Sequence, residues 1–305
     1  MSLRAVKQII ETTPTIEGAG VKLQRAFGFG KTKEFDPFLL LDDFRNENPA
    51  DYLAGFPWHP HRGIETITYV LAGEVEHGDS LGNKGKMGAG DVQWMTAGSG
   101  ILHQEMPRGD AHGRMHGFQL WANLPAALKM TAPRYQDIRA EEIPEVTEDD
   151  GAKARVICGD FWGAQGPVTG VATESNVAAR YVDISVPPNK RKRIKVETTR
   201  NAFAYVFAGA GTFRDASDPQ AVLTESGVDP NAPAVYDAKN HSLVLFDRGD
   251  EIVVQAGPEG IRFLLVSGQP LEEPVAWYGP IVMNTQAELR QAMSELQSGK
   301  FIRHQ

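Results

Sequence analysis

The stretch GFPWHPHRGIET at residues 55–66, together with GDVQWMTAGSGILHQEMP at residues 90–107, decides the fold and the chemistry that this sequence predicts. Both stretches place β-branched and aromatic residues between glycines, which is typical of short strands joined by tight turns. In the first stretch His59 and His61 are two positions apart. Because successive side chains of a strand point to opposite faces, these two imidazoles would share one face.

The second stretch repeats this spacing with His103 and Glu105. Two strands can therefore direct three imidazoles and one carboxylate at a single point. Imidazole nitrogens with a carboxylate oxygen suit a divalent first-row transition metal, and four such ligands leave octahedral positions open. The pattern favours a mononuclear metal site inside a β-barrel. The alternative interpretation is two surface turns that contain histidine.

Composition limits the other possibilities. The 305 residues suffice for two domains, since a domain takes about 150 residues. A net charge of -8 disfavours direct binding to nucleic acid, which needs a basic surface. Cys158 is the single cysteine, so an intramolecular disulfide is excluded and a reducing compartment is indicated. Without an apolar run of signal-peptide or membrane-spanning length, we expect a cytoplasmic protein that does not engage a membrane.

A weak internal repeat runs through the chain. YVLAG at residues 69–73 recurs as YVFAG at residues 205–209, and the Gly-Asp and Ala-Gly pairs of residues 90–98 recur in residues 249–257. The second copy is longer, with an insertion at residues 215–240 that is rich in Pro, Asp and Ala. The repeat predicts two copies of one β-domain.

Strand-like segments fill both copies, which predicts an all-β barrel or sandwich. These segments are Glu65 to Leu71, Asp91 to Thr96, Phe118 to Ala122, Ala202 to Phe207, Ser242 to Phe246 and Ile261 to Val266. Near the C-terminus, Thr285 and Glu288 form a capping box, and Leu289, Met293 and Leu296 follow on one helical stripe. We expect this helix to pack on a barrel; a partner-binding helix is the alternative.

The two histidine-bearing stretches resemble the cupin motifs, and most closely those of one branch, the pirins. QLWANLP at residues 119–125 and GPIVMNT at residues 279–285 are also similar to pirin segments. The resemblance implies a bicupin: an all-β fold with two double-stranded β-helix (jelly-roll) barrels in tandem and a C-terminal helix. We expect a metal-binding barrel at residues 1–140, a connector with shared strands at 141–180, and a metal-free barrel with the helix at 181–305.

The resemblance also implies a ligand set, with one metal in the N-terminal barrel. It assigns the metal to His59, His61, His103 and Glu105. Glu65 occupies the position where many other cupins place their acidic ligand. It is expected to accept a hydrogen bond from a ligand imidazole, and it remains the alternative carboxylate ligand.

The internal repeat predicts the metal content of the second barrel independently of the resemblance. Carrying the four ligand positions into the second copy leads to Lys195, Glu197, Arg262 and Leu264. Two cations and a leucine cannot replace three histidines and a glutamate, so we expect no metal there.

The resemblance implies a reaction as well. Pirins are similar to cupin flavonol dioxygenases, and several act on quercetin. The expected activity is 2,3-dioxygenation with release of carbon monoxide, from a small flavonol-like substrate and O2. The expected metal is Fe(II), with Mn, Co, Ni, Cu or Zn possible in purified protein, and Glu105 or Glu65 would accept the substrate proton. A non-flavonoid substrate is one alternative; another is a metal- or redox-sensing binding protein that acts on transcription factors or metabolic enzymes.

The residues that line the substrate cavity are harder to predict, because the interior of a small barrel is filled by side chains of its core. Four side chains are expected to contact the substrate: Phe56, Trp58, Arg62 and Gln119. For Arg62 a salt bridge to Asp42 or Asp43 is the alternative. His77 is expected in a solvated turn. No feature indicates a protein partner, and a monomer is expected.

Overall fold

The computed structural model describes residues 2–170, 177–213 and 238–304. Most of the predicted insertion at 215–240 lies outside these residues. The chain divides into two compact units. The first barrel comprises Thr12–Pro144, Val156–Arg180 and Gly268–Gln305, and the second barrel comprises Met1–Glu11, Glu145–Arg155 and Tyr181–Ser267. This division differs from the predicted one, because the C-terminal helix groups with the first barrel and the first eleven residues group with the second.

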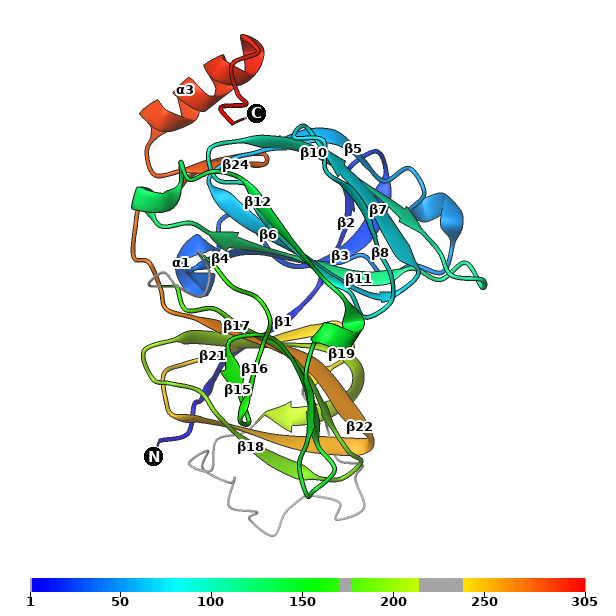
Figure 1. Ribbon diagram of the computed structural model, residues 1–305. Coiled ribbons are helices and arrows are strands. Elements are labelled where there is room, and N and C mark those ends of the chain that lie inside the picture. The colour runs from blue at the N-terminus through cyan, green and yellow to red at the C-terminus, as the bar shows by residue number, and fades with distance from the viewer. Residues whose placement is uncertain (1, 171–176, 214–237, 305) are drawn as a thin grey trace. The chain divides into compact units, whose positions relative to one another are not determined.

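The first barrel contains two antiparallel sheets (Figure 1). The larger sheet has the order β12 (Arg134–Ile138), β9 (Val92–Thr96), β6 (Ile64–Ala72), β11 (His116–Asn123), β4 (Phe38–Asp43), β3 (Val21–Phe27) and β2 (Thr13–Glu17). The smaller sheet has the order β5 (Phe56–His61), β10 (Ile101–Arg108), β7 (Glu74–Asp79) and β8 (Lys84–Met87). Short helical turns connect these strands: α1 (Thr32–Phe35), η1 (Pro49–Asp51), η2 (Ala126–Leu128) and η3 (Ala140–Glu142).

Strand β10 shows why this sequence forms a barrel wall. Its residues alternate between buried and less buried along its length, which is the period of a strand with one face toward a core. The buried face carries His103 and Glu105 between Ile101 and Pro107. Two apolar clusters support the interior, one around Val21, Phe44, Tyr52 and Met115 and the other around Leu39, Ile64, Met95 and Val282. The polar side chains thus lie among well-packed apolar ones.

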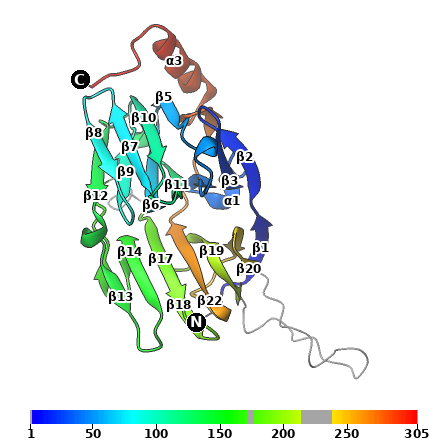
Figure 2. The ribbon, with the colours of Figure 1, turned by 90° about the vertical axis from the view of Figure 1, so that its right-hand side faces the viewer.

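The C-terminal part of the first barrel begins with a small ladder, β23 (Ala276–Tyr278) and β24 (Ile281–Met283), and continues as helix α3 (Gln286–Gln297) (Figure 2). Thr285 caps α3 through the predicted box: its hydroxyl accepts from the Glu288 amide at 3.2 Å, and Glu288 Oε2 accepts from the Thr285 amide at 2.8 Å. An apolar cluster that includes Ile281, Leu289 and Phe301 packs the helix onto this ladder. The predicted helix is confirmed. A further two-stranded ladder, β15 (Asp160–Phe161) with β16 (Ala164–Gln165), also lies in this unit.

The second barrel is built on one large sheet. Its main path runs through β1 (Val6–Glu11), β21 (Ser242–Phe246), β19 (Asn201–Phe213), β22 (Glu251–Gly268), β17 (Arg180–Val186), β14 (Lys153–Cys158) and β13 (Glu145–Thr147), with β18 (Arg191–Lys195) on β22 and β20 (Ala238–Lys239) on β19. Strand β21 is buried along its whole length. Every strand predicted from the sequence is present, but two are longer than expected, since β19 continues to Phe213 and β22 begins at Glu251.

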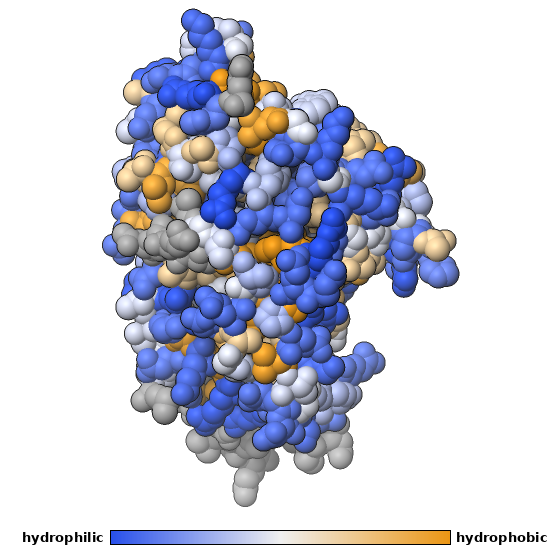
Figure 3. All heavy atoms as spheres, in the orientation of Figure 1, coloured by the Kyte–Doolittle hydropathy of each residue, from blue (hydrophilic) through white to orange (hydrophobic). Residues whose placement is uncertain are grey.

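The face of the molecule seen in Figure 3 is mostly hydrophilic, with scattered apolar side chains. Among the residues that the structure describes, no helix is long and apolar enough to span a membrane.

Candidate metal centre

Antiparallel pairing of β5 with β10 brings the predicted histidines together. His59 lies opposite His103, and His61 lies opposite Ile101. Within the described part of the chain, the potential ligand atoms of His59, His61 and His103 all lie within 4.8 Å of one another. The ring centroids are 4.4 to 4.9 Å apart. Strand alternation and pairing, both readable in part from the sequence, therefore produce a cluster of three imidazoles.

Backbone carbonyls determine which nitrogens of two imidazoles face the cluster. His59 Nδ1 lies 2.9 Å from the Pro57 carbonyl oxygen, and His61 Nδ1 lies 3.2 Å from that of Pro280. A carbonyl can only accept, so each Nδ1 carries a hydrogen, and in a neutral imidazole the Nε2 then presents a lone pair. The two Nε2 atoms are 3.1 Å apart. Two facing lone pairs repel, whereas two neighbouring octahedral ligands about 2.1 Å from a metal would lie about 3.0 Å apart.

The third imidazole supports the same interpretation. His103 is 1% exposed, and neither ring nitrogen has a hydrogen-bond partner among the described residues. Burial lowers the pKa of both His61 and His103, and the neighbouring imidazoles lower it further. Neutral imidazole is the form that binds a metal. Burial therefore favours the metal-binding, neutral form of His61 and His103, and His103 has no hydrogen-bond partner among the described residues.

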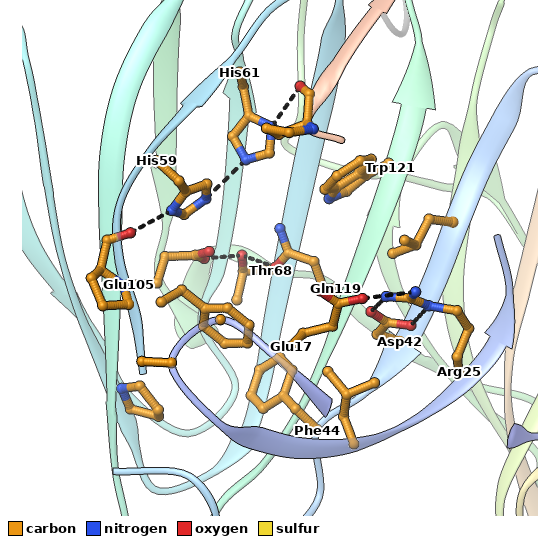
Figure 4. Close-up of a pocket in the computed structure, with 18 of the residues that line it drawn as sticks. Glu17, Arg25, Asp42, Phe44, His59, His61, Thr68, Glu105, Gln119 and Trp121 are labelled. Atoms are coloured by element: carbon orange, nitrogen blue, oxygen red, sulfur yellow. Dashed lines mark hydrogen bonds and ion pairs between the residues drawn. The ribbon is translucent and has the colours of Figure 1, made fainter. Parts of the chain in front are cut away.

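The predicted fourth ligand, Glu105, lies beside this cluster and outside the 4.8 Å group. Its Oε1 accepts from the Thr68 hydroxyl at 2.9 Å, and Thr68 Oγ1 also lies 2.7 Å from Gln119 Oε1 (Figure 4). One hydroxyl hydrogen serves only one of these oxygens, so the other bond needs a hydrogen from the Gln119 amide or from Glu105. Burial raises the pKa of Glu105, while His59 and Thr68 oppose that rise.

A cavity of about 480 Å³ opens beside the cluster (Figure 4). His59, His61, Glu105 and Gln119 form part of its wall, and apolar side chains form much of the rest: Leu23, Phe29, Leu40, Phe44, Phe56, Val75 and Trp121. Away from the imidazoles the cavity wall contains charged side chains that form ion pairs. Arg25 there binds Asp42 through two hydrogen bonds, at 2.8 and 2.7 Å, and Glu17 at 2.9 Å. Burial raises the pKa of Asp42 to about 6, although Arg25 opposes the rise.

Two of the four predicted substrate contacts, Phe56 and Gln119, lie in this wall. Trp58 is 53% exposed and lies outside the cavity's described lining, because it points to the face of β5 opposite to His59. Arg62 also lies outside that lining and is 1% exposed. It pairs with neither Asp42 nor Asp43; its ion-pair partner is Glu295, from helix α3.

The prediction that Glu65 accepts a hydrogen bond from a ligand imidazole is wrong. Its two carboxylate oxygens accept from Trp94 Nε1 at 2.9 Å and from Thr96 Oγ1 at 2.6 Å. Burial raises its pKa, which these two hydrogen bonds oppose. Glu65 is therefore a satisfied polar group of the core, outside the described cavity wall.

For two residues near the site the prediction from the sequence was incomplete or wrong: Thr68 was not predicted, and His77 was predicted in a solvated turn. His77 is 6% exposed rather than solvated, lies opposite Glu105 on β7, and stacks on Tyr135. Thr68 bridges Glu105 and Gln119. Strand alternation in the run that contains Thr68 and the pairing of β7 with β10 are the signals that could have identified them.

Comparisons with known proteins agree with this architecture. The pirin family model matches residues 20–122, and the model of the pirin C-terminal cupin domain matches residues 181–302. A pirin-like protein of Caulobacter vibrioides is 43% identical over 99% of this chain and 100% of its own length. This chain belongs to the pirin family. Pirin of Homo sapiens is 36% identical over 93% of this chain and 89% of its own.

This pirin also resembles a solved structure along almost its whole length. The crystal structure of a quercetin 2,3-dioxygenase from Acinetobacter baumannii is similar with a TM-score of 0.83 and 30% identity, covering 98% of this chain and 99% of that one. The predicted fold, an all-β tandem of two cupin domains with a C-terminal helix, is confirmed.

Proposed function

We propose that this pirin is a metal-dependent dioxygenase that cleaves flavonols such as quercetin, with release of carbon monoxide. The observation that supports this function is the cluster of three imidazoles in the first barrel, those of His61 and His103 buried and that of His59 partly exposed, beside a cavity of about 480 Å³. Cavities that hold compact organic ligands usually measure about 300 to 1,000 Å³. The likeness to the Acinetobacter baumannii quercetin 2,3-dioxygenase supports the same class of reaction.

His59, His61, His103 and Glu105 would hold one divalent transition metal. Fe(II) is the proposed ion, and Mn, Co, Ni, Cu or Zn would occupy the site according to availability. When bound, the ion would supply a Lewis acid that lowers the pKa of a chelating substrate hydroxyl and a centre that takes part in the reaction with O2.

Glu105 is the proposed acceptor of the substrate proton. Its carboxylate lines the cavity, whereas both oxygens of Glu65 are already bonded to Trp94 and Thr96. Thr68 holds Oε1 of Glu105 in place. A general base must lie within hydrogen-bond reach of the proton that it takes, and of the two candidate carboxylates Glu105 lies beside the imidazoles.

The cavity wall supports an aromatic substrate that carries hydroxyl groups. Phe44, Phe56 and Trp121 provide an apolar surface for rings and exclude water. Glu17, ion-paired with Arg25 away from the imidazoles, provides an acceptor for hydroxyl hydrogens. A cavity of this size favours an enzyme over the alternative of a regulatory binding protein, for which an occluded barrel is expected.

The test is anaerobic reconstitution with Fe(II), followed by quercetin and O2. We expect loss of flavonol absorbance with release of one carbon monoxide per flavonol, both absent in His61→Ala. Metal binding without turnover would exclude quercetin as the substrate and favour another substrate or the regulatory role. Turnover that persists in His61→Ala would exclude the proposed site.

A further inference from the structure

The C-terminal segment of the first barrel, residues 276–301, contacts the end of β5 that carries His61. Arg62 and Ile281 form an isolated parallel bridge, and the Val282 amide donates to the Arg62 carbonyl at 3.0 Å. The carbonyl that receives His61 Nδ1 belongs to Pro280, in the same segment. One ligand imidazole is thus oriented by a chain segment more than 200 residues away in the sequence.

Arg62, which follows His61 directly, anchors this segment with both Nη atoms of its guanidinium, while its Nε binds Ser99. Nη1 donates to Glu295 Oε2 at 2.8 Å, Nη2 to the Phe301 carbonyl at 2.9 Å, and Nε to the Ser99 carbonyl at 2.7 Å. The guanidinium also lies over the Phe301 ring, 4.2 Å from its centroid. A buried guanidinium needs such partners because desolvation of its charge is unfavourable.

Two further features keep the contact close. Gly63 has a φ of +77°, and a Cβ at this position would overlap the Val282 carbonyl. Lys129 Nζ bridges the two segments, since it donates to the Gly63 carbonyl at 2.8 Å and to the Val282 carbonyl at 3.0 Å. Only a glycine admits both this backbone conformation and this approach.

From these contacts we infer that the C-terminal segment is a positioning element of the metal site, and that Arg62 and Glu295 form the latch that holds it. The Pro280 carbonyl fixes the hydrogen of His61 on Nδ1 and directs Nε2 toward the cluster. Release of the latch frees this carbonyl, and His61 then loses its fixed ring orientation. The inference rests on the proposed metal binding and assigns Arg62 a positioning role.

Co(II) provides the test, because both its affinity and its ligand-field spectrum are measurable without turnover. Glu295→Met removes the acceptor and keeps a helix-forming side chain. Gln297→Met places the same side chain at an exposed position of the same helix and is the matched control. Arg62→Lys keeps the charge but not the three-way hydrogen bonding. Competition with a chromophoric chelator gives the Kd, and circular dichroism verifies folding.

We expect Glu295→Met to weaken Co(II) binding about tenfold, the lower end of the effect of residues that orient a ligand, and to change the Co(II) spectrum. Arg62→Lys is expected to weaken it more, and Gln297→Met is expected to stay within about twofold of the wild type. Folded Glu295→Met protein with the affinity and spectrum of the wild type overturns the latch, as does an equal loss in Gln297→Met. Absence of Co(II) binding in the wild type overturns the proposed metal site itself.

Discussion

The two barrels of this pirin place different chemistry at equivalent positions of one repeat. In the first barrel His103 is buried, with both ring nitrogens lacking a partner among the described residues. Its counterpart in the second barrel, Arg262, binds Asp183 through two hydrogen bonds, at 2.9 and 2.6 Å. The counterpart of Glu105 is the fully buried Leu264.

The difference is one of burial and pairing: the side chain of Arg262 is 38% exposed and ion-paired, whereas His103 is 1% exposed. The second barrel pairs its cation with a carboxylate or replaces the polar residue by leucine. The first barrel keeps three imidazoles whose potential ligand atoms lie within 4.8 Å of one another, the arrangement on which the proposed metal site rests. Even the supporting residue differs: Thr68, which holds Glu105, corresponds to Ala204 in the repeat.

Substitution of a proposed metal-ligating histidine should have the largest effect on the difference between the two barrels. We expect His61→Ala and His103→Ala to reduce the bound metal from about one equivalent per chain to almost none, because each removes a nitrogen ligand. Arg262→Ala, at the position that corresponds to His103, should leave the metal content unchanged. Elemental analysis after reconstitution measures the content, and a full complement in both histidine variants would contradict the assigned ligands.

The glycines that end the repeated signature should behave alike in both barrels. Gly73 has a φ of +77° and Gly209 a φ of +65°, and an added Cβ would overlap the Arg108 or the Gly260 carbonyl. We expect Gly73→Ala and Gly209→Ala each to reduce the free energy of unfolding by about 2 to 4 kcal/mol. Urea denaturation measures this change.

The control for the glycine variants is Gly82→Ala. Gly82 also has a positive φ, +88°, but an added Cβ meets nothing within 4 Å. Its variant should lose only about 1 kcal/mol, from backbone strain alone. Equal losses in all three variants would show that the close carbonyl contacts are unimportant.

Thr68→Val makes the first barrel resemble the second at one position. Without the hydroxyl, Oε1 of Glu105 loses its donor, and we expect metal affinity to fall about tenfold. Thr66→Val makes the same change two residues earlier on β6 and should have little effect. Competition with a chelator measures the metal affinity of both variants. Equal affinities would show that Thr68 does not support the metal site.

A decrease in pH should have the smallest effect of these changes, and it should reduce the local stability of the C-terminal helix α3. Hydrogen bonds from Arg303, Gln291 and Arg62 outweigh burial and lower the pKa of Glu295 to about 2. A carboxylate with a folded pKa below its unfolded value stabilises the fold above about pH 4.5 and loses this contribution as the pH falls toward 2. Hydrogen exchange of α3 at pH 5 and pH 2.5, corrected for intrinsic rates, should show reduced protection in acid, and Glu295→Met should show a smaller difference.

The strands, the helix and the three-imidazole cluster could be predicted because each depends on a local pattern. Alternation along β5 and β10 fixes the shared face of His59 and His61 and the buried face that carries His103. The same alternation points Trp58 outward, so its position was also readable. The position of Arg62 could not be predicted from the sequence, because its partner Glu295 lies 233 positions away and no local pattern encodes that contact. Glu65 occupies an acidic position of the cupin motif, but its core neighbours Trp94 and Thr96 take its hydrogen-bonding capacity.

Neither barrel is continuous in the sequence, and this affects the order of events during synthesis. The first barrel takes residues 12–144 and 156–180 early in the chain but receives Gly268–Gln305 only after the second barrel's residues 181–267. Ribosomes extend a chain at about 5 to 20 residues per second, so these parts emerge several seconds apart. A nascent chain therefore exposes His59, His61 and His103 before the Pro280 carbonyl exists to orient His61. Orientation of His61 by this carbonyl therefore has to follow synthesis of residues 181–267 of the second barrel.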